Sequence, residues 1–344
     1  MELNFYPVIT NDGSIGLFNT EVDDIYHSSK GAYTEAIEKF IAPSSLKQKL
    51  KEVKTFNFLD ICFGIGYNSM CAIEKILETN FEGIVYIDAL EIDYHVVAFS
   101  ILKKNKPFKF DILSFLDFSI FENLELFDSI FKIIEDKNFD NFLCPNKIDF
   151  FIKNKNVLYK NIHHPQKSSY LHNIYYRYVS ERNNETAQTP QNNCKISLLV
   201  HLADARQKVS IMETKYDLIF LDAFTPIKLP TLWSVEFFKV LNDLLTDEGN
   251  ITTYSNSAAI RNGMLEAGLF IGKTEFGTIA YKNIPNNFLP LDEKSLGLMQ
   301  TKAGIPFYDP ELNESGEEIL SRRKKMIEIS QKQSSSQFLK KYQI

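Results

Sequence analysis

The chain has 344 residues, of which 44% are hydrophobic and 24% are charged, and its formal net charge at pH 7 is -6. This composition is that of a folded globular protein and excludes a largely disordered chain. The net negative charge excludes a protein that is basic over its whole surface, although it permits a local basic face for nucleic acid.

The first residues contain no basic segment followed by an apolar one, and no apolar run reaches the roughly 18 residues that a membrane span needs. The cysteines, Cys62, Cys71, Cys144 and Cys194, lie at wide and irregular spacing, so neither a disulfide framework nor a zinc motif is expected. The sequence therefore predicts a cytoplasmic protein with reduced thiols and no membrane contact.

Short β-branched or aromatic runs alternate with segments of helical length between about residues 56 and 281. Such alternation is typical of a parallel sheet with crossover helices, and it predicts an α/β fold. The expected strands are 56–62, 83–92, 197–204, 216–223 and 249–255. The expected helices are 67–79, 94–104, 205–212, 232–244 and 258–267.

The alternation fails between about residues 136 and 195, where Asn, Lys, Tyr and His dominate. We interpret this segment as a partly helical insertion that ends in a polar linker. The predicted organisation is an N-terminal extension over residues 1–50, a main domain over 51–310 that contains the insertion, and a helical tail over 311–344.

A glycine-containing loop joins the first predicted strand to the helix after it. Gly64 and Gly66 have no side chains, so they would let the backbone pass close to a nucleotide-like ligand at the start of that helix. The next strand ends in Glu91, where a doubly wound sheet places an acidic residue for ribose hydroxyls, with Asp93 as a rival. The alternatives are a tight turn without a ligand and a solvated carboxylate at the strand end.

The glycine loop differs from that of dinucleotide-binding enzymes. Asn68 and Ser69 occupy the region where those enzymes need a third glycine. A glycine-poor loop fits S-adenosylmethionine better, because this cofactor has no pyrophosphate to hold. Asp204 lies at the carboxyl end of the third strand, where it could meet an adenine amino group or cap the next helix.

A proline-rich loop follows the fourth strand. Asp222 stands where this strand ends, at the edge where open α/β sheets bind ligands. Two prolines restrict the backbone beyond it, so Phe224, Lys228 and Trp233 are expected to form a rigid wall over a pocket for a planar base. The alternative for Phe224 and Trp233 is that they cover a hydrophobic core.

A metal site is not expected. His163, His164 and His172 follow Cys144 in the sequence, but they lack the spacing of a closed four-ligand site, and no predicted strand or helix frames them.

Six separated segments resemble the methyltransferase half of the bifunctional tRNA 5-methylaminomethyl-2-thiouridine biosynthesis proteins and its stand-alone relatives. The specific element is the loop D-x-F-x-P-x-K-x-P-x-x-W that begins at Asp222, whereas the glycine loop and the acidic strand ends are shared by many methyltransferases. The segments are 22–41, 60–69, 201–206, 221–233, 252–269 and 301–312.

The resemblance implies a Rossmann-like class I methyltransferase with a mostly parallel sheet and helices on both faces, formed by residues 51–310. It implies methyl transfer from S-adenosylmethionine to the exocyclic amine of 5-aminomethyluridine, with or without 2-thiolation, at the wobble position of the tRNA anticodon loop. The bifunctional members also carry a flavin-dependent oxidoreductase half that is not recognisable in this sequence. FAD is therefore not expected, a separate flavin-dependent enzyme would act upstream, and a monomer is the default expectation.

The resemblance also implies roles for single residues. Those of the cofactor site would be Gly64, Gly66 and Asn68 in the loop, Glu91 at the ribose and Asp204 at the adenine. Asp222 would face the reacting amine as the catalytic residue. Residues 1–50 would close the site, and the substrate-binding residues would be Asp23, Asp24, Tyr26, Phe224, Lys228 and Trp233.

Several cations are expected to contact tRNA phosphates: Lys228, Arg261, those of the segment 147–182, and residues 322–325. A solvated charged surface is the alternative for each of them. Two other functions stay open at this point. One is an aminopropyltransferase of the spermidine-synthase kind, and the other is a non-catalytic RNA-binding protein with a methyltransferase fold.

Overall fold

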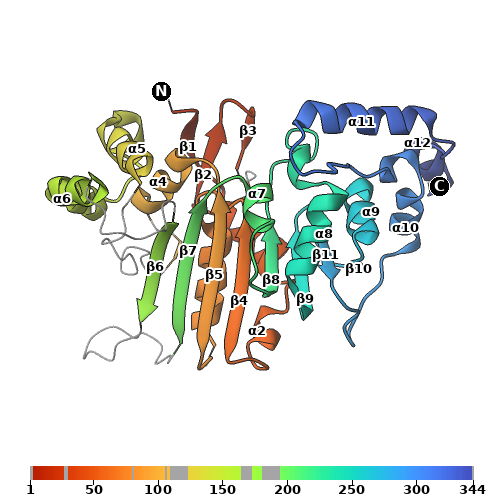
Figure 1. Ribbon diagram of the computed structural model, residues 1–344, viewed down its shortest axis with the longest axis horizontal. Helices are drawn as coiled ribbons and strands as arrows, with labels where there is room; N and C mark the ends of the chain where they lie inside the picture. Colours follow the sequence, from red (N-terminus) through yellow and green to blue (C-terminus); the bar gives the residue numbers. More distant parts are fainter. Residues whose placement is uncertain are drawn as a thin grey trace. The chain divides into compact units, whose positions relative to one another are not determined.

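The computed structural model describes residues 3–26, 30–79, 81–104, 107–108, 123–163, 173–179 and 194–342. The chain divides into two compact units. Figure 1 labels the helices and strands of both. Unit 1 comprises Met1–Ile41 and Ser45–Asp204, and unit 2 comprises Ala42–Ser44 and Ala205–Ile344.

The main strands of unit 1 place β5 between β4 and β7, with both pairs parallel, while β6 runs antiparallel beside β7. Their bounds are β4 (Thr55–Ile61), β5 (Ile84–Glu91), β6 (Asn173–Val179) and β7 (Lys195–Leu202). Phe56, Phe58, Leu59 and Ile61 of β4 are all fully buried. Such a near-continuous apolar run is what a parallel strand covered on both faces requires.

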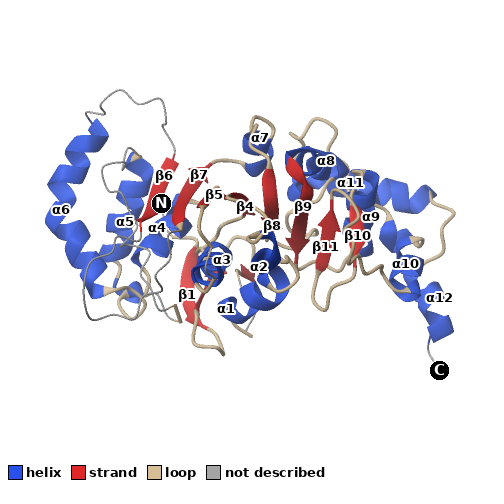
Figure 2. Ribbon diagram, turned by 90° about the horizontal axis from the view of Figure 1, so that it is seen from below, coloured by secondary structure: helices blue, strands red, loops and turns tan. Residues whose placement is uncertain are grey.

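The helices of unit 1 connect and cover these strands. Figure 2 looks along the strands and shows α1 and α3 grouped on one side of them. Helix α5 packs on α4, and α6 packs on α5 (Figure 1). The helices are α1 (Ala32–Glu35), α2 (Leu46–Lys49), α3 (Tyr67–Leu77), α4 (Tyr94–Leu102), α5 (Leu124–Glu135) and α6 (Pro145–His163), with a π-helical segment η1 (Ala36–Ile41) and a 3₁₀ turn η4 (Lys137–Phe139).

The segment predicted as an insertion contributes to this unit in two ways. Its first part forms the helix α6, as a partly helical insertion would. Its second part contains β6, which adds a strand beside β7 and was not anticipated from the polar composition. The polar linker predicted after it lies outside the described residues.

A small antiparallel sheet at the N-terminus, with strands β1 (Phe5–Ile9), β2 (Ile15–Asn19) and β3 (Asp24–Ile25), belongs to the same unit. The amide of Ile15 donates a hydrogen bond of 2.9 Å to the hydroxyl of Tyr67, the first residue of α3. Tyr67 is buried, and burial raises the pKa of its hydroxyl. The N-terminal sheet is therefore anchored on the helix that follows the glycine loop.

Asp12 fastens the turn between β1 and β2 to the start of α1. Its carboxylate accepts hydrogen bonds of 2.9 Å from the amide of Ser14 and from the amide and hydroxyl of Thr34. Burial opposes ionisation of this carboxyl group, but the hydrogen bonds from Ser14 and Thr34 outweigh it and lower its pKa to about 2.

The depressed pKa of Asp12 predicts a loss of stability in acid. An Asp in an unfolded chain titrates near pH ~3.9, so ionised Asp12 stabilises the folded state above that pH, and this contribution disappears as the pH falls toward about 2. Asp12→Asn should therefore lower the free energy of unfolding at neutral pH and flatten its decline between about pH 4 and about pH 2. Urea denaturation at a series of pH values measures this, and parallel profiles for the two proteins would contradict it.

Unit 2 has its own set of strands. In it β8 (Tyr216–Leu221) and β9 (Leu245–Thr253) are parallel, β11 (Thr278–Tyr281) is antiparallel to β9, and β10 (Phe270–Gly272) is antiparallel to β11. The helices are α7 (Ala205–Val209), α8 (Val235–Leu244), α9 (Ala258–Glu266), α10 (Glu293–Met299), α11 (Gly316–Ile329) and α12 (Ser335–Leu339), with 3₁₀ turns η5 (Pro230–Leu232), η6 (Lys302–Gly304) and η7 (Lys340–Tyr342).

The predicted strands and the predicted helices between them are confirmed, with ends that differ by a few residues. Strand β9 begins at Leu245, earlier than expected, and α8 begins at Val235, later than expected, because the 3₁₀ turn η5 precedes it. The mostly parallel α/β fold is confirmed with them. Among the described residues, no helix combines the length and the apolar character that crossing a bilayer needs.

Candidate cofactor and substrate sites

The glycine loop, Glu91 and Asp204 lie at one edge of unit 1, because β4, β5 and β7 end together. In the strand register Ile61 pairs with Leu90, and Glu91 pairs with Leu202. Beyond the strands, the amide of Phe63 donates to the carbonyl of Leu90, and the amide of Ala203 donates to the carbonyl of Glu91, both at 2.9 Å. Asp204 follows directly. Such an edge is where open α/β sheets bind ligands.

The carboxylate of Glu91 closes the glycine loop. One oxygen accepts a hydrogen bond of 2.8 Å from the amide of Gly64, and the other accepts from the amides of Ile92 and Asp93, at 2.8 and 3.1 Å. Burial raises the pKa of Glu91, although these amides favour the ionised form. A carboxylate has about four acceptor positions, so the three amides leave one unfilled, on a residue that is 8% exposed. Its use by a ribose hydroxyl stays a prediction.

Asp93 has a different role from Glu91. Its carboxylate accepts hydrogen bonds from the amides of His95 and Val96, at 2.8 and 3.3 Å, and so caps the N-terminus of α4. This cap accounts for Asp93 and leaves Glu91 as the better candidate for the ribose.

The loop itself has the backbone that glycine favours. Gly64 and Gly66 adopt φ angles of 55° and 85°, and Gly66 is the N-cap of α3. Cys62 shares this left-handed conformation with a φ of 66°, which its residue type did not indicate. Asn68 lies in the first turn of α3 and is only 4% exposed.

Gly66→Ala is expected to weaken cofactor binding. A Cβ atom at Gly66 would lie 2.7 Å from the ring of Phe63, in addition to the cost of about 1–2 kcal/mol for a left-handed alanine. Gly13→Ala is the matched control, since Gly13 has a φ of 79° in the turn after β1 but nothing within 4 Å of its added Cβ. Calorimetric titration with S-adenosylhomocysteine should show weaker binding only for the Gly66 variant. Equal affinities would contradict the role of this loop.

The side chain of Tyr26 lies against the glycine loop. Its amide donates to the carbonyl of Leu17, and its ring lies so close to Gly64 that a Cβ there would be 3.4 Å from Tyr26 Cδ1. Burial and the neighbouring carboxylate of Glu91 raise the pKa of Tyr26. Asp24 accepts a hydrogen bond from the amide of Ile25 in β3, and Asp23 is exposed. The substrate roles of Asp23, Asp24 and Tyr26 stay predictions.

A buried polar pair behind the loop was not predicted. The hydroxyl of Ser69 in α3 donates a hydrogen bond of 2.5 Å to the carboxylate of Asp60 in β4, and both residues are fully buried. This bond joins the end of β4 to the first turn of α3. The sequence carried one signal for it, a single carboxylate within the apolar run from Phe58 to Ile61.

In unit 2, Asp222 stands one residue beyond β8, at the edge where β8 and β9 end. Leu221 pairs with Thr253, and the hydroxyl of Tyr254 donates a hydrogen bond of 2.9 Å to the carbonyl of Ala223. Asp222 itself is half-buried. A half-buried carboxylate at the end of a parallel strand is suitably placed for contact with a polar substrate group.

Trp233 supports the proline-rich loop from inside. The residue is fully buried, its Nε1 donates a hydrogen bond of 2.8 Å to the carbonyl of Phe224, and its ring meets Tyr254 edge-on at 6.0 Å. With no exposed surface it cannot stack on a base in this conformation, which favours the alternative that it covers a core. Phe224 is half-buried and Lys228 is exposed at the tip of the loop.

Several cations predicted to contact phosphates bind the protein itself. Arg261 is 9% exposed and donates from its guanidinium to Thr278 Oγ1, Asn256 Oδ1 and the carbonyl of Gly277, while burial lowers its pKa. Lys147 is 1% exposed and donates to the carbonyl of Lys103. The prediction of phosphate contacts is therefore wrong for Arg261 and Lys147, because both are buried and donate to acceptors of the protein instead.

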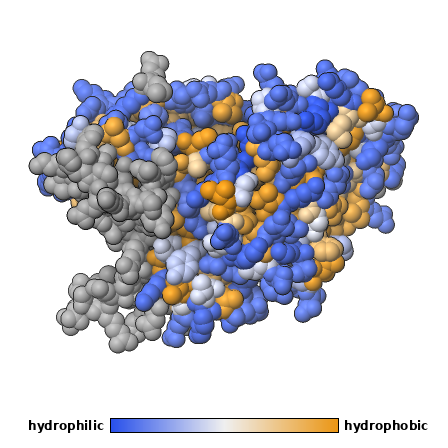
Figure 3. Space-filling model, viewed as in Figure 1, coloured by the Kyte–Doolittle hydropathy of each residue, from blue (hydrophilic) through white to orange (hydrophobic). Residues whose placement is uncertain are grey.

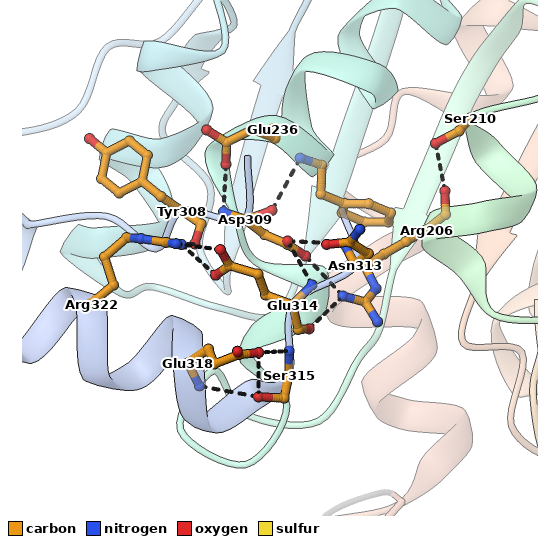
Figure 4. A network of polar contacts seen from close by, with 12 residues as sticks. Arg206, Ser210, Glu236, Tyr308, Asp309, Asn313, Glu314, Ser315, Glu318 and Arg322 are labelled. Carbon is orange, nitrogen blue, oxygen red and sulfur yellow. Dashed lines mark hydrogen bonds and ion pairs between the residues drawn. The ribbon is translucent and has the colours of Figure 1, made fainter. Parts of the chain in front are cut away.

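The motif at 301–312 forms a buried polar network with the start of α7 (Figure 4). Asp309 is fully buried, and its Oδ2 accepts a hydrogen bond of 2.9 Å from Arg206, whose guanidinium also donates to the carbonyl of Glu314. The amide of Asp309 donates to Glu236 in α8. The sequence offered both motifs but no reason to pair them.

The three histidines considered for a metal site, His163, His164 and His172, lie at or beyond the limit of the described residues. His164 and His172 lie outside the described residues, and the side chain of His163 is also outside them. Within the ranges that the structure describes, no group of three His, Cys, Asp or Glu residues could hold a metal ion.

Comparisons with known proteins agree with this architecture. Residues 165–279 match the family described as S-adenosyl-L-methionine-dependent methyltransferase, so the last part of the segment predicted as an insertion lies inside the family pattern. The crystal structure of MnmC2 from Aquifex aeolicus is similar, with a TM-score of 0.62 and 23% identity over 95% of this chain and 86% of that one, which shows the shared Rossmann-like fold.

Two curated relatives add to this. An uncharacterised protein of Methanocaldococcus jannaschii is 27% identical over 97% of this chain and 78% of its own length. The tRNA 5-methylaminomethyl-2-thiouridine biosynthesis bifunctional protein MnmC of Burkholderia vietnamiensis is 31% identical over 22% of this chain, a match that spans 11% of that protein. The resemblance predicted from the motifs is thereby confirmed.

Proposed function

Since the chain is an S-adenosylmethionine-dependent methyltransferase, we propose that it methylates the exocyclic amine of 5-aminomethyluridine, with or without 2-thiolation, at the wobble position of tRNA. The observation that carries the proposal is the loop D-x-F-x-P-x-K-x-P-x-x-W, which leaves β8 with Asp222 half-buried at the strand end. The bifunctional relative whose name states this pathway supports the choice of substrate.

The residues of unit 1 fit the proposed cofactor. Gly64 and Gly66 leave the loop without side chains, and the carboxylate of Glu91 keeps one acceptor position for a ribose hydroxyl. Asp204 at the end of β7 would lie by the adenine. When bound, S-adenosylmethionine supplies an electrophilic methyl group on a positively charged sulfur.

The chemical difficulty lies in the charge of the substrate amine. Only the neutral amine has a lone pair that can form the new N–C bond, and an alkylamine that resembles Lys has a pKa of about 10.4. Neutralising it at pH 7 costs about 4.6 kcal/mol. Lowering this cost, or offsetting it by accurate orientation, is what the site residues must achieve.

Asp222 is assigned first to orientation and second to proton acceptance. Its carboxylate can accept a hydrogen bond from the amine and direct the lone pair, and it can receive the proton that leaves the nitrogen as the methyl group is transferred. A carboxylate also favours the ammonium form, which opposes deprotonation. Desolvation of the amine acts in the other direction, so orientation is the larger contribution expected of Asp222.

The remaining assignments complete the proposal. Phe224 and Tyr26 would contact an unstacked base from the anticodon loop, and Lys228 would contact its phosphates. A separate flavin-dependent enzyme would supply the aminomethyl precursor. The reaction would take place in the cytoplasm, where tRNA is modified, and Asp23 and Asp24 would help to close the site.

Nucleoside mass spectrometry tests the proposal. tRNA that holds 5-aminomethyluridine is incubated with the protein and S-adenosylmethionine, and a gain of one methyl group on that nucleoside is the expected result. No gain, in a protein that binds the cofactor, would reject this acceptor. A parallel assay with polyamines and decarboxylated S-adenosylmethionine tests the aminopropyltransferase alternative, for which any product would be evidence.

A further inference from the structure

We infer that the exposed lysines of the C-terminal helices of unit 2 form a contact surface for the tRNA backbone, and that the neighbouring arginines do not belong to it. The surface consists of Lys324, Lys325, Lys332 and Lys340. The inference rests on the proposed function, because it names where that substrate is held.

Residues 322–342 are strongly basic, but their cations are of two kinds. This stretch contains two arginines, Arg322 and Arg323, and five lysines. Its one acidic residue is Glu328. The local excess of positive charge contrasts with the net charge of -6 for the whole chain. The structure separates those cations that hold the fold together from those that face solvent.

Arg322 and Arg323 are held by the protein. Arg322 forms a two-pronged ion pair with Glu314 and donates to the carbonyl of Tyr308 (Figure 4). Arg323 donates from Nε to the carbonyl of Ile305 at 2.7 Å and stacks on the ring of Phe307 at 4.6 Å, and burial lowers its pKa. Both arginines therefore fasten α11 to the motif at 301–312.

The four lysines of the proposed surface face solvent instead. On α11 the inward positions are those of Ile319, Arg322 and Arg323, so Lys324 and Lys325 fall on the opposite side of the helix and are exposed. Lys332 and Lys340, beyond this helix, are exposed too. No ion pair or hydrogen bond to any of the four ammonium groups is found within the part of the chain that the structure describes.

Two contacts bring these segments together around the turn η6. From α11, Arg323 reaches the carbonyls of Ala303 and Ile305, and the amide of Lys302 donates a hydrogen bond of 3.0 Å to the carbonyl of Gln333 in the turn before α12. Phe338 of α12 is buried against Gly297 of α10. The lysines are thus carried by one packed group of helices, and Figure 3 shows that its exposed surface around α11 is mainly hydrophilic.

A polyanion is the partner that such a surface fits. Each lysine that neutralises a phosphate releases counterions, which supplies most of the affinity of a protein for a nucleic acid backbone. An anionic membrane is a weaker match, because a membrane-binding helix needs an apolar face beside its cations, and the large apolar side chain exposed on α11 is that of Ile329 alone.

The test compares two double variants with a matched control. Lys324→Ala with Lys325→Ala, and Lys332→Ala with Lys340→Ala, each remove two exposed lysines of the surface. Lys51→Ala with Lys54→Ala removes two lysines of unit 1 that are also exposed. The affinity for tRNA that holds 5-aminomethyluridine is measured over a range of salt concentrations, and methyl transfer is measured at low and saturating tRNA.

Each surface variant is expected to reduce the slope of log affinity against log salt by about 1.5 to 2, to raise the KM for tRNA and to leave kcat unchanged. Lys324→Arg with Lys325→Arg should restore the slope, and the control should keep it.

If the wild-type enzyme methylates tRNA but the slopes of the surface variants are unchanged, the surface is overturned and the proposed function stays intact. Changed slopes without methylation by wild type would support the surface and reject the reaction. If the surface variants kept their affinity for tRNA but lost binding to phosphatidylserine vesicles, the lysines would form a membrane contact and the proposed tRNA surface would be overturned.

Discussion

Asp222→Asn is expected to lower kcat for methyl transfer about 100-fold or more, the loss typical of removing a group that accepts a proton in the transition state. The asparagine keeps the shape of the side chain, but its neutral amide oxygen accepts a weaker hydrogen bond from the amine than a carboxylate does, so it orients the lone pair less well. It also cannot receive the proton that leaves the nitrogen. Cofactor affinity should be unchanged, since Gly64, Gly66 and Glu91 are untouched. Single-turnover kinetics and calorimetric titration with S-adenosylhomocysteine measure the two quantities separately.

Asp217→Asn provides the control for this prediction. Asp217 lies near the other end of the same strand, β8, where its carboxylate accepts a hydrogen bond of 3.2 Å from the hydroxyl of Thr246. Its replacement should leave kcat within a factor of about two, which corresponds to a change of about 0.4 kcal/mol in the activation free energy. If Asp222→Asn turned over as fast as this control, Asp222 would have no role in the chemistry, and another group would have to accept the proton.

Asp309→Ala is expected to destabilise the folded protein by about 3 kcal/mol, the lower end of the cost of breaking a buried ion pair, because it leaves the half-buried guanidinium of Arg206 without its counter-ion. The side chain of Arg206 is 14% exposed and that of Asp309 is 0% exposed, so water cannot compensate fully. The substitution also removes the acceptor for the amides of Asn313 and Glu314, both 3.1 Å from Asp309 Oδ1. Urea denaturation followed by circular dichroism measures the loss.

Asp309→Asn should lose less than Asp309→Ala, because one amide oxygen can still accept from those backbone groups. Adding Arg206→Met to Asp309→Asn should cost less than the sum of the two single changes, since the second change removes a charge that the first has already left unpaired. Additive losses would mean that the two residues stabilise the protein independently and that the network in Figure 4 is not a unit.

The fold could be predicted because its strongest determinants are local. In β4, four fully buried apolar residues lead into two glycines with left-handed backbone, and this order of residue types by itself indicates a strand, a turn and a helix. By contrast β6 lies in a segment rich in Asn, Lys and Tyr. Its place beside β7 depends on pairing between distant residues, as that of Tyr176 with Leu198, which composition does not reveal.

The candidate site was predictable only in part, for a similar reason. Gly64 and Glu91 stand at strand ends of unit 1, and Asp222 stands at a strand end of unit 2. Within each unit, neighbouring parallel strands end at the same edge whatever lies between them in the sequence. The roles of Arg261 and Trp233 depend on what surrounds them instead. Arg261 is pinned by Thr278, which is 17 positions away, and the indole of Trp233 is enclosed by the core. A charge or an aromatic ring in a sequence does not state whether it faces solvent.

The buried position of Trp233 makes the proline-rich loop visible by fluorescence. It is the one tryptophan of the sequence, so the indole emission of the protein comes from this loop and from nowhere else. Its Nε1 donates a hydrogen bond to the carbonyl of Phe224, two residues after Asp222, and its ring contacts Tyr254, the residue after β9. Any ligand that shifts the segment from Asp222 to Phe224 will alter that emission, which allows each step of binding to be followed on the unmodified protein.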